Sequence, residues 1–99
     1  MTITELQHEA HKIAVENGWY EEPRPPLELL ALIHSEVSEC VEAWREPTDR
    51  MESVAEELAD TIIRILDAAE YWGIDLEQAI HAKMEVNRSR GHRHGGKRF

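Results

Sequence analysis

Residues 26–47, PLELLALIHSEVSECVEAWREP, are the strongest indication of the fold class, because they predict one long amphipathic helix. Pro26 suits the first turn of a helix, whereas Pro47 cannot continue one. Between the two prolines, apolar side chains recur at intervals of three and four residues and form one face. That face consists of Leu29, Leu30, Ile33, Val37, Cys40, Val41 and Trp44.

Helical signals also occupy the rest of the chain, and no segment shows the alternation typical of a strand. We expect a first helix at about residues 4–17, a third helix that Gly73 ends, and a fourth whose pattern dissolves near Ser89. Each should begin with a capping residue that has a partner three positions further on. These pairs are Thr4 with Gln7, Asp49 with Glu52 or Ser53 with Glu56, and Asp75 with Gln78.

Four such helices predict an all-α fold, a four-helix bundle in a single domain that spans residues 1–99. A chain of 99 residues has a marginal length for burying a self-sufficient core. The two long helices have wide apolar faces that one chain covers poorly. We therefore expect homo-oligomerisation, to a homodimer or a homotetramer, to complete the bundle.

The net charge of −9 is distributed unevenly along the chain. Residues 1–87 carry 20 acids and six Lys or Arg, whereas residues 88–99 carry five Lys or Arg and no acid. The acidic body argues against a nucleic-acid surface there. The basic end predicts an irregular tail that binds a polyanion or folds back on the chain's own acids.

The cellular compartment can be predicted from this sequence only by elimination. No apolar run reaches the roughly 18 residues of a membrane span, and the first ten residues lack the features of a secretion signal. Cys40 is the single cysteine, so an intrachain disulfide cannot form. We expect a cytoplasmic protein without a membrane partner.

Two pairs of acids lie beside the apolar faces of the long helices. Glu36 and Glu39 on one helix, and Glu57 and Asp60 on the next, are each three residues apart and therefore side by side. Like charges at that spacing destabilise a helix unless something pairs with them. The bases on these two helices are few: Arg45, Arg50 and Arg64.

A divalent cation would resolve that repulsion, because a cage of carboxylate oxygens suits Mg²⁺ or Mn²⁺. The spacing alone also fits an ordinary solvated acidic face, which is the commoner reason for such pairs.

The order of these motifs adds information that the spacing lacks. The pairs read E-V-S-E (36–39) and E-L-A-D (57–60), with 17 residues between them, and K-M-E-V-N-R-S-R (83–90) follows downstream. This set resembles the ExxE…ExxD signature and the Lys-x-x-x-Asn-x-x-Arg segment of the MazG-like all-α nucleoside triphosphate pyrophosphohydrolases. The glycine-rich basic end, HRHGGKRF (92–99), is similar to that of some short members.

The resemblance implies an enzyme that hydrolyses a (d)NTP to the (d)NMP and pyrophosphate with Mg²⁺, for which Mn²⁺ is a possible substitute, in nucleotide-pool sanitation. It implies that Glu36, Glu39, Glu57 and Asp60 are the metal ligands, and that Glu39 or Glu36 takes a proton from the attacking water. The residues implied to bind the substrate are Lys83, Asn87, Arg90, His94 and Lys97.

Two alternatives remain open from the sequence. The first is a catalytically silent helical interaction module whose basic tail docks on an acidic partner. The second is nucleic-acid binding through residues 88–99, which would depend strongly on salt. For the tail itself, closing over the phosphates and having no fixed structure are both compatible with the sequence.

Overall fold

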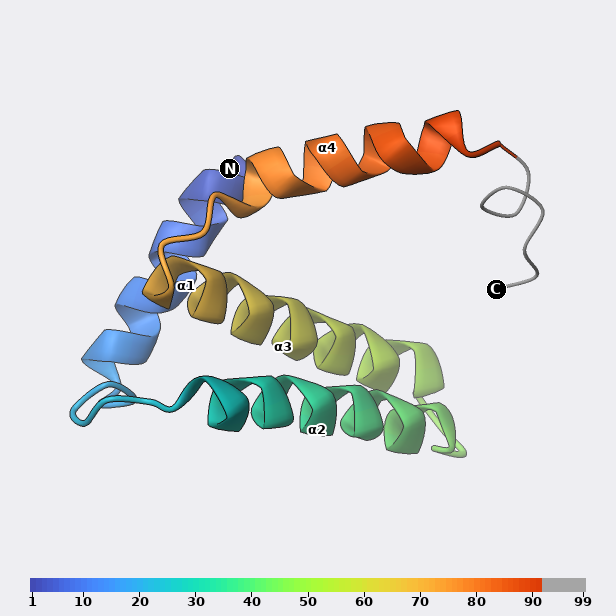
Figure 1. Ribbon diagram of the computed structural model, residues 1–99. Coiled ribbons are helices and arrows are strands. Elements are labelled where there is room, and N and C mark those ends of the chain that lie inside the picture. The colour runs from blue at the N-terminus through green and yellow to red at the C-terminus, as the bar shows by residue number, and fades with distance from the viewer. Residues whose placement is uncertain (92–99) are drawn as a thin grey trace.

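The computed structural model describes residues 1–91, and it contains four α-helices (Figure 1). No strand occurs within that range. The predicted all-α class and the number of helices are therefore confirmed. The helices are α1 (Ile3–Glu16), α2 (Pro26–Trp44), α3 (Arg50–Tyr71) and α4 (Leu76–Ser89).

The cap of α1 lies earlier in the sequence than predicted. Thr2, not Thr4, is the N-cap: its hydroxyl accepts from the Glu5 amide at 3.1 Å, and the Glu5 carboxylate accepts from the Thr2 amide at 2.8 Å. The predicted partner Gln7 is instead buried, and its amide donates to Glu70 on α3 at 3.0 Å. A tertiary contact therefore uses the side chain that the local pattern assigned to a cap.

The other helix boundaries follow the sequence closely. Pro26 is the first residue of α2, and the Asp75 carboxylate caps α4 by accepting from the Gln78 amide at 3.1 Å. Asp49 precedes α3 as predicted, but it has left-handed backbone angles with φ at 53° and makes no side-chain cap. Asp is one of the few residues that tolerate this conformation, which lets the chain turn sharply after Pro47.

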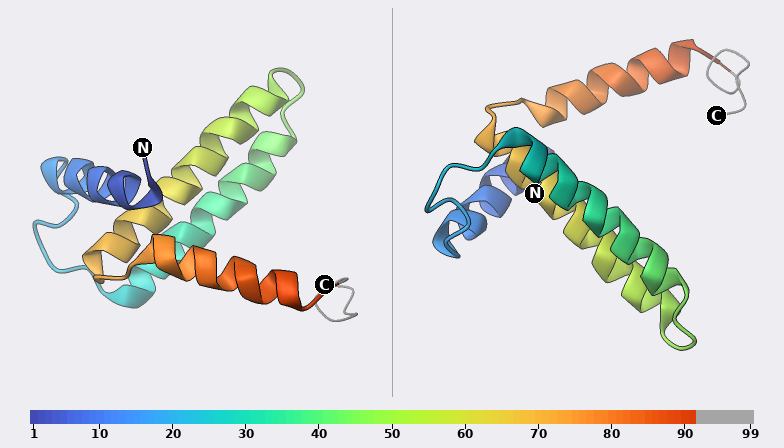
Figure 2. Two further views of the ribbon diagram at one scale, coloured as in Figure 1. Left: turned by 90° about the horizontal axis from the view of Figure 1, so that it is seen from above. Right: turned by 60° about the horizontal axis from the view of Figure 1, so that its bottom comes forward.

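Helices α2 and α3 form an antiparallel pair, and α1 crosses the C-terminal half of α3 (Figures 1 and 2). Short side chains at the contacts let these helices approach closely. The buried apolar residues are Ala10 on α1, Leu29 and Ala43 on α2, and Leu66, Ala68 and Ala69 on α3.

Helix α4 touches the first turn of α1 and then projects away from α2 and α3 (Figures 1 and 2). The Thr4 amide donates to the Glu77 carboxylate at 3.1 Å, which fixes the start of α4. No residue of α4 is buried. Within one chain only α1, α2 and α3 therefore share a core, and closure of the predicted bundle would depend on self-association.

Much apolar surface stays exposed in consequence. Val37, Val41, Leu58 and Ile62 are each about half exposed, although they belong to the apolar stripes of α2 and α3. None of the described helices is long and apolar enough to cross a membrane. Completion of the bundle by self-association remains a prediction.

Candidate metal centre

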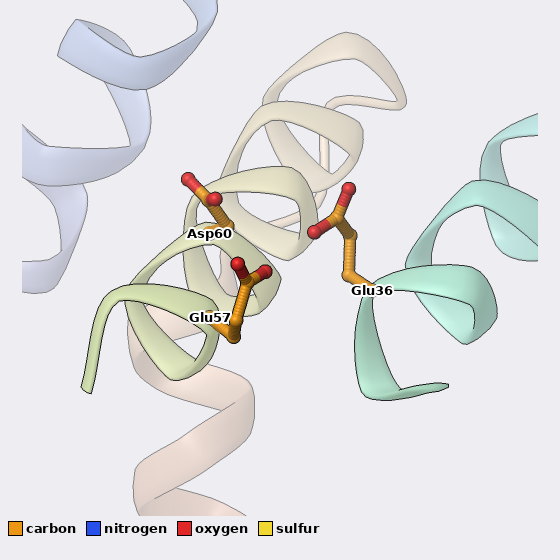
Figure 3. A group of neighbouring side chains, drawn as sticks. All are labelled: Glu36, Glu57 and Asp60. Atoms are coloured by element: carbon orange, nitrogen blue, oxygen red, sulfur yellow. The ribbon is translucent and has the colours of Figure 1, made fainter. Parts of the chain in front are cut away.

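The antiparallel pairing of α2 and α3 brings acids from both helices together. One carboxylate oxygen each of Glu36, Glu57 and Asp60 lie within 4.8 Å of one another (Figure 3). Figure 3 shows Glu36 reaching across from α2 toward the two acids of α3. Glu36 and Glu57 are half-buried, and Asp60 is exposed. We refer to these three residues as the acidic cluster.

The electrostatics of the acidic cluster are those of crowded like charges. Desolvation raises the pKa of Glu57, and the charges of Asp60 and Glu36 raise it further. Glu39 and Glu56 add smaller contributions of the same sign. A proton or a cation near Glu57 would relieve this repulsion.

Arg64 supplies the one positive charge that contacts the acidic cluster among the described residues. It follows Asp60 by one turn of α3, and its Nε donates to Glu36 Oε1 at 2.8 Å. The guanidinium also lies over the ring of Trp19, 4.3 Å from its centroid. Sequence reasoning counted Arg64 only as one of the few bases; its i+4 spacing from Asp60 was the available signal.

A cavity of about 210 Å³ adjoins the acidic cluster between α1 and α3. Asp60 and Arg64 lie at its wall together with Trp19, from the turn after α1. The remaining lining residues are Ala10, Ile13, Ala14, Asn17, Ile63 and Asp67.

Asp67, which also lines this cavity, is almost fully buried, at 7% exposure. Its two oxygens accept from His11 Nδ1 at 2.8 Å and from the Tyr20 hydroxyl at 2.7 Å. Burial and this hydrogen bond raise the pKa of Tyr20. The buried carboxylate is thus hydrogen-bonded on both sides, which holds α1 and the loop after it against α3.

The other predicted site residues lie elsewhere. Glu39 is exposed one turn along α2 and is not part of the acidic cluster. Lys83 and Asn87 lie in the half of α4 that projects away, and Arg90 is its C-cap. Residues His94 and Lys97 lie outside the described residues.

Two comparisons with known proteins bear on this site. No protein-family model matches the chain. The chain is 30% identical over 100 residues to dCTP pyrophosphatase 1 of Mus musculus, an alignment that covers 90% of this chain and 58% of the mouse protein. The chain thus spans little more than half the length of that relative, and it is distantly similar to a nucleotide pyrophosphatase.

Proposed function

We propose that this protein is a Mg²⁺-dependent nucleoside triphosphate pyrophosphohydrolase that converts a (d)NTP to the (d)NMP and pyrophosphate, in nucleotide-pool sanitation. The observation that carries the proposal is the meeting of Glu36 with Glu57 and Asp60 across two helices. The similarity to dCTP pyrophosphatase 1 supports the same reaction class.

The acidic cluster fits a small, hard cation. All of its donors are carboxylate oxygens, which Mg²⁺ and Mn²⁺ prefer. Two oxygens on one Mg²⁺ are at most about 4.2 Å apart, because each Mg–O distance is about 2.1 Å. The 4.8 Å limit of the cluster is only slightly wider, so small side-chain adjustments would close it. Bound Mg²⁺ would screen the phosphate charge and stabilise the charge that develops as the bond breaks.

Glu39 is our candidate for the general base, and Glu36 is the alternative. Glu39 lies outside the acidic cluster, yet close enough for its charge to act on Glu57. An acid not engaged with the cation is free to accept a proton. In the proposed step, a water oxygen bonds to phosphorus, the P–O bond between the α- and β-phosphates breaks, and Glu39 takes the water proton.

The nucleoside would occupy the cavity beside Asp60. Trp19 lies at its wall, and the cavity opens next to the place where the phosphates would meet the acidic cluster. The triphosphate would then extend from the cavity toward the acidic cluster.

Lys83, Asn87 and Arg90 are proposed to bind phosphate and sugar, but from a second copy of the chain. They share one face of α4 at i, i+4 and i+7, and α4 projects away from the acids of its own chain. Among the described residues, Asn87 Oδ1 is covered and has no hydrogen-bond partner. A homo-oligomer in which α4 packs on the neighbouring α2–α3 pair would both bury apolar surface and complete the site.

The direct test is a pyrophosphate-release assay over ribo- and deoxynucleoside triphosphates with Mg²⁺ and with Mn²⁺. Asp60→Asn and Glu57→Gln should each lower kcat by at least about 100-fold, because charge stabilisation by the cation is lost. Glu56→Gln, an exposed neighbour outside the acidic cluster, is the matched control and should stay near wild type. Circular dichroism should show unchanged helix content. Full activity in Asp60→Asn would contradict the proposal, as would a wild-type protein that releases pyrophosphate from none of the nucleotides.

A further inference from the structure

Arg64 holds a position that the proposed reaction does not explain. Its side chain is 28% exposed and that of Glu36 15%, so their ion pair is largely shielded from water. On its other side the guanidinium lies against Trp19. Arg64 therefore has two fixed neighbours, one in the acidic cluster and one at the wall of the cavity.

The pair with Glu36 competes with a bound cation. A cation in the acidic cluster would bind the Glu36 carboxylate. Oε1 of that carboxylate already accepts a hydrogen bond from Arg64 Nε at 2.8 Å. A divalent cation within a few ångströms of a guanidinium is also repelled by it, and the repulsion is strong where water is partly excluded. Arg64 thus supplies in advance part of the charge neutralisation that a metal ion would bring.

Trp19 would keep the Arg64 side chain in place if Glu36 released it in order to bind a cation. The contact between the guanidinium and the indole ring does not depend on Glu36. Arg64 also lines the cavity next to Asp60, where a triphosphate would approach the acidic cluster. Its Nη1 and Nη2 make no hydrogen bond to any described residue, and a planar guanidinium is well suited to grip phosphate with two donors.

We propose that Arg64 is an exchangeable counter-ion: it neutralises Glu36 in the cation-free protein and transfers to the phosphates of the nucleotide when a divalent cation occupies the acidic cluster. This inference rests on the proposed function. It assigns Arg64 two effects of opposite sign, weakening cation binding in the absence of nucleotide and strengthening nucleotide binding in its presence.

The first measurement is Mn²⁺ binding to the nucleotide-free protein, by titration calorimetry or by electron paramagnetic resonance. Arg64→Ala should bind Mn²⁺ roughly tenfold more tightly than wild type, because Glu36 loses its competing partner. Arg50→Ala is the matched control. Arg50 is on α3, as Arg64 is, and its guanidinium also lies over a tryptophan ring, that of Trp44 on α2, 5.2 Å from the ring centroid. The Arg50→Ala substitution removes the same charge from α3 and should change the Mn²⁺ affinity by less than about twofold.

The second measurement is kcat/KM for a hydrolysed nucleotide at saturating Mn²⁺. Arg64→Ala should lose at least about tenfold, because a charge-assisted phosphate contact is missing. Arg64→Lys keeps a positive charge without the planar fork, so its Mn²⁺ affinity should stay near wild type while kcat/KM falls to an intermediate value.

The outcomes separate the two proposals. Unchanged or weaker Mn²⁺ binding in Arg64→Ala overturns the counter-ion role, even if the wild type is an active enzyme, and so does an unchanged kcat/KM. A wild type that releases pyrophosphate from none of the nucleotides overturns the proposed function itself, and this inference with it. Thermal melts of each variant verify that the fold is retained.

Discussion

At the scale of single residues, the contacts between α1 and α3 are unusually polar for so small a core. Gln7 and His8 both bind Glu70, the latter through Nδ1 at 2.6 Å, and His11 and Tyr20 both bind Asp67. Asp67 and Glu70 are therefore each satisfied by two partners from the N-terminal part of the chain. These pairs specify where α1 docks, because leaving the buried Gln7 and Asp67 side chains unpaired would be costly.

Glu70 predicts a dependence of stability on pH. The hydrogen bond from His8 lowers the pKa of Glu70 below its usual value of 4.5, although desolvation opposes the shift and Gln7 lowers the pKa further. A carboxyl group whose pKa is lower in the folded state stabilises the fold above the unfolded pKa, and this contribution disappears as the pH falls through the folded pKa. Glu70→Gln should thus be less stable than wild type at pH 6, with the difference shrinking below about pH 4.5.

Urea denaturation at several pH values and fixed protein concentration measures this difference. Glu16→Gln is the control, since Glu16 is exposed at the end of α1 and its carboxyl group makes no hydrogen bond to a described residue. A difference between Glu70→Gln and wild type that stays constant from pH 6 to pH 3 would refute the assignment.

At the scale of elements, the helix ends depend on a few backbone conformations that glycines in the sequence predict. Gly73 has φ at +70° and follows the C-cap of α3, where it turns the chain toward α4. Gly91 has φ at +71° just after α4. A Cβ at either position would meet no atom within 4 Å, so only the backbone conformation opposes a larger residue.

We expect Gly73→Ala to lower the free energy of unfolding by about 1 kcal/mol, because an L-residue resists the left-handed region. Gly91→Ala should cost much less, since α4 buries no residue and its end can unwind without loss of packing. Urea titration of both variants gives the comparison. Equal losses for the two would show that the bend at Gly73 does not hold packed elements in place.

At the scale of the whole molecule, the exposed stripes of α2 and α3 and the unpacked α4 favour packing against a second chain. Apolar exposure of this extent is typical of chains that associate. We expect Leu58→Asp, on the α3 stripe, to convert a dimer or tetramer into smaller species in light scattering after size exclusion. Val15→Asp on α1 is the control, because Val15 is 50% and Leu58 51% exposed. A wild type that is monomeric at all concentrations would refute the expectation.

The proposal that α4 of one chain completes the site of its neighbour leads to a quantitative prediction. Asp60→Asn and the double variant Lys83→Ala/Asn87→Ala should each be inactive alone. Refolded together in equal amounts, they should recover about a quarter of wild-type activity, since half of randomly formed dimers are mixed and each mixed dimer holds one intact site. No recovery would mean that α4 serves the acids of its own chain.

Local signals were enough to predict the four helices, most of their boundaries and the two acid pairs, because periodicity, prolines, glycines and caps act within a few residues. They also placed Glu36, Glu57 and Asp60 on flanks that could face one another. Three features follow from the packing of the helices alone: these three acids meet while Glu39 stays outside, Arg64 pairs with Glu36 and lies over Trp19, and Gln7 binds Glu70 in place of the predicted cap. Such contacts depend on how α1, α2 and α3 cross, and crossing geometry is set by packing between residues far apart in the chain, on which local periodicity carries no information.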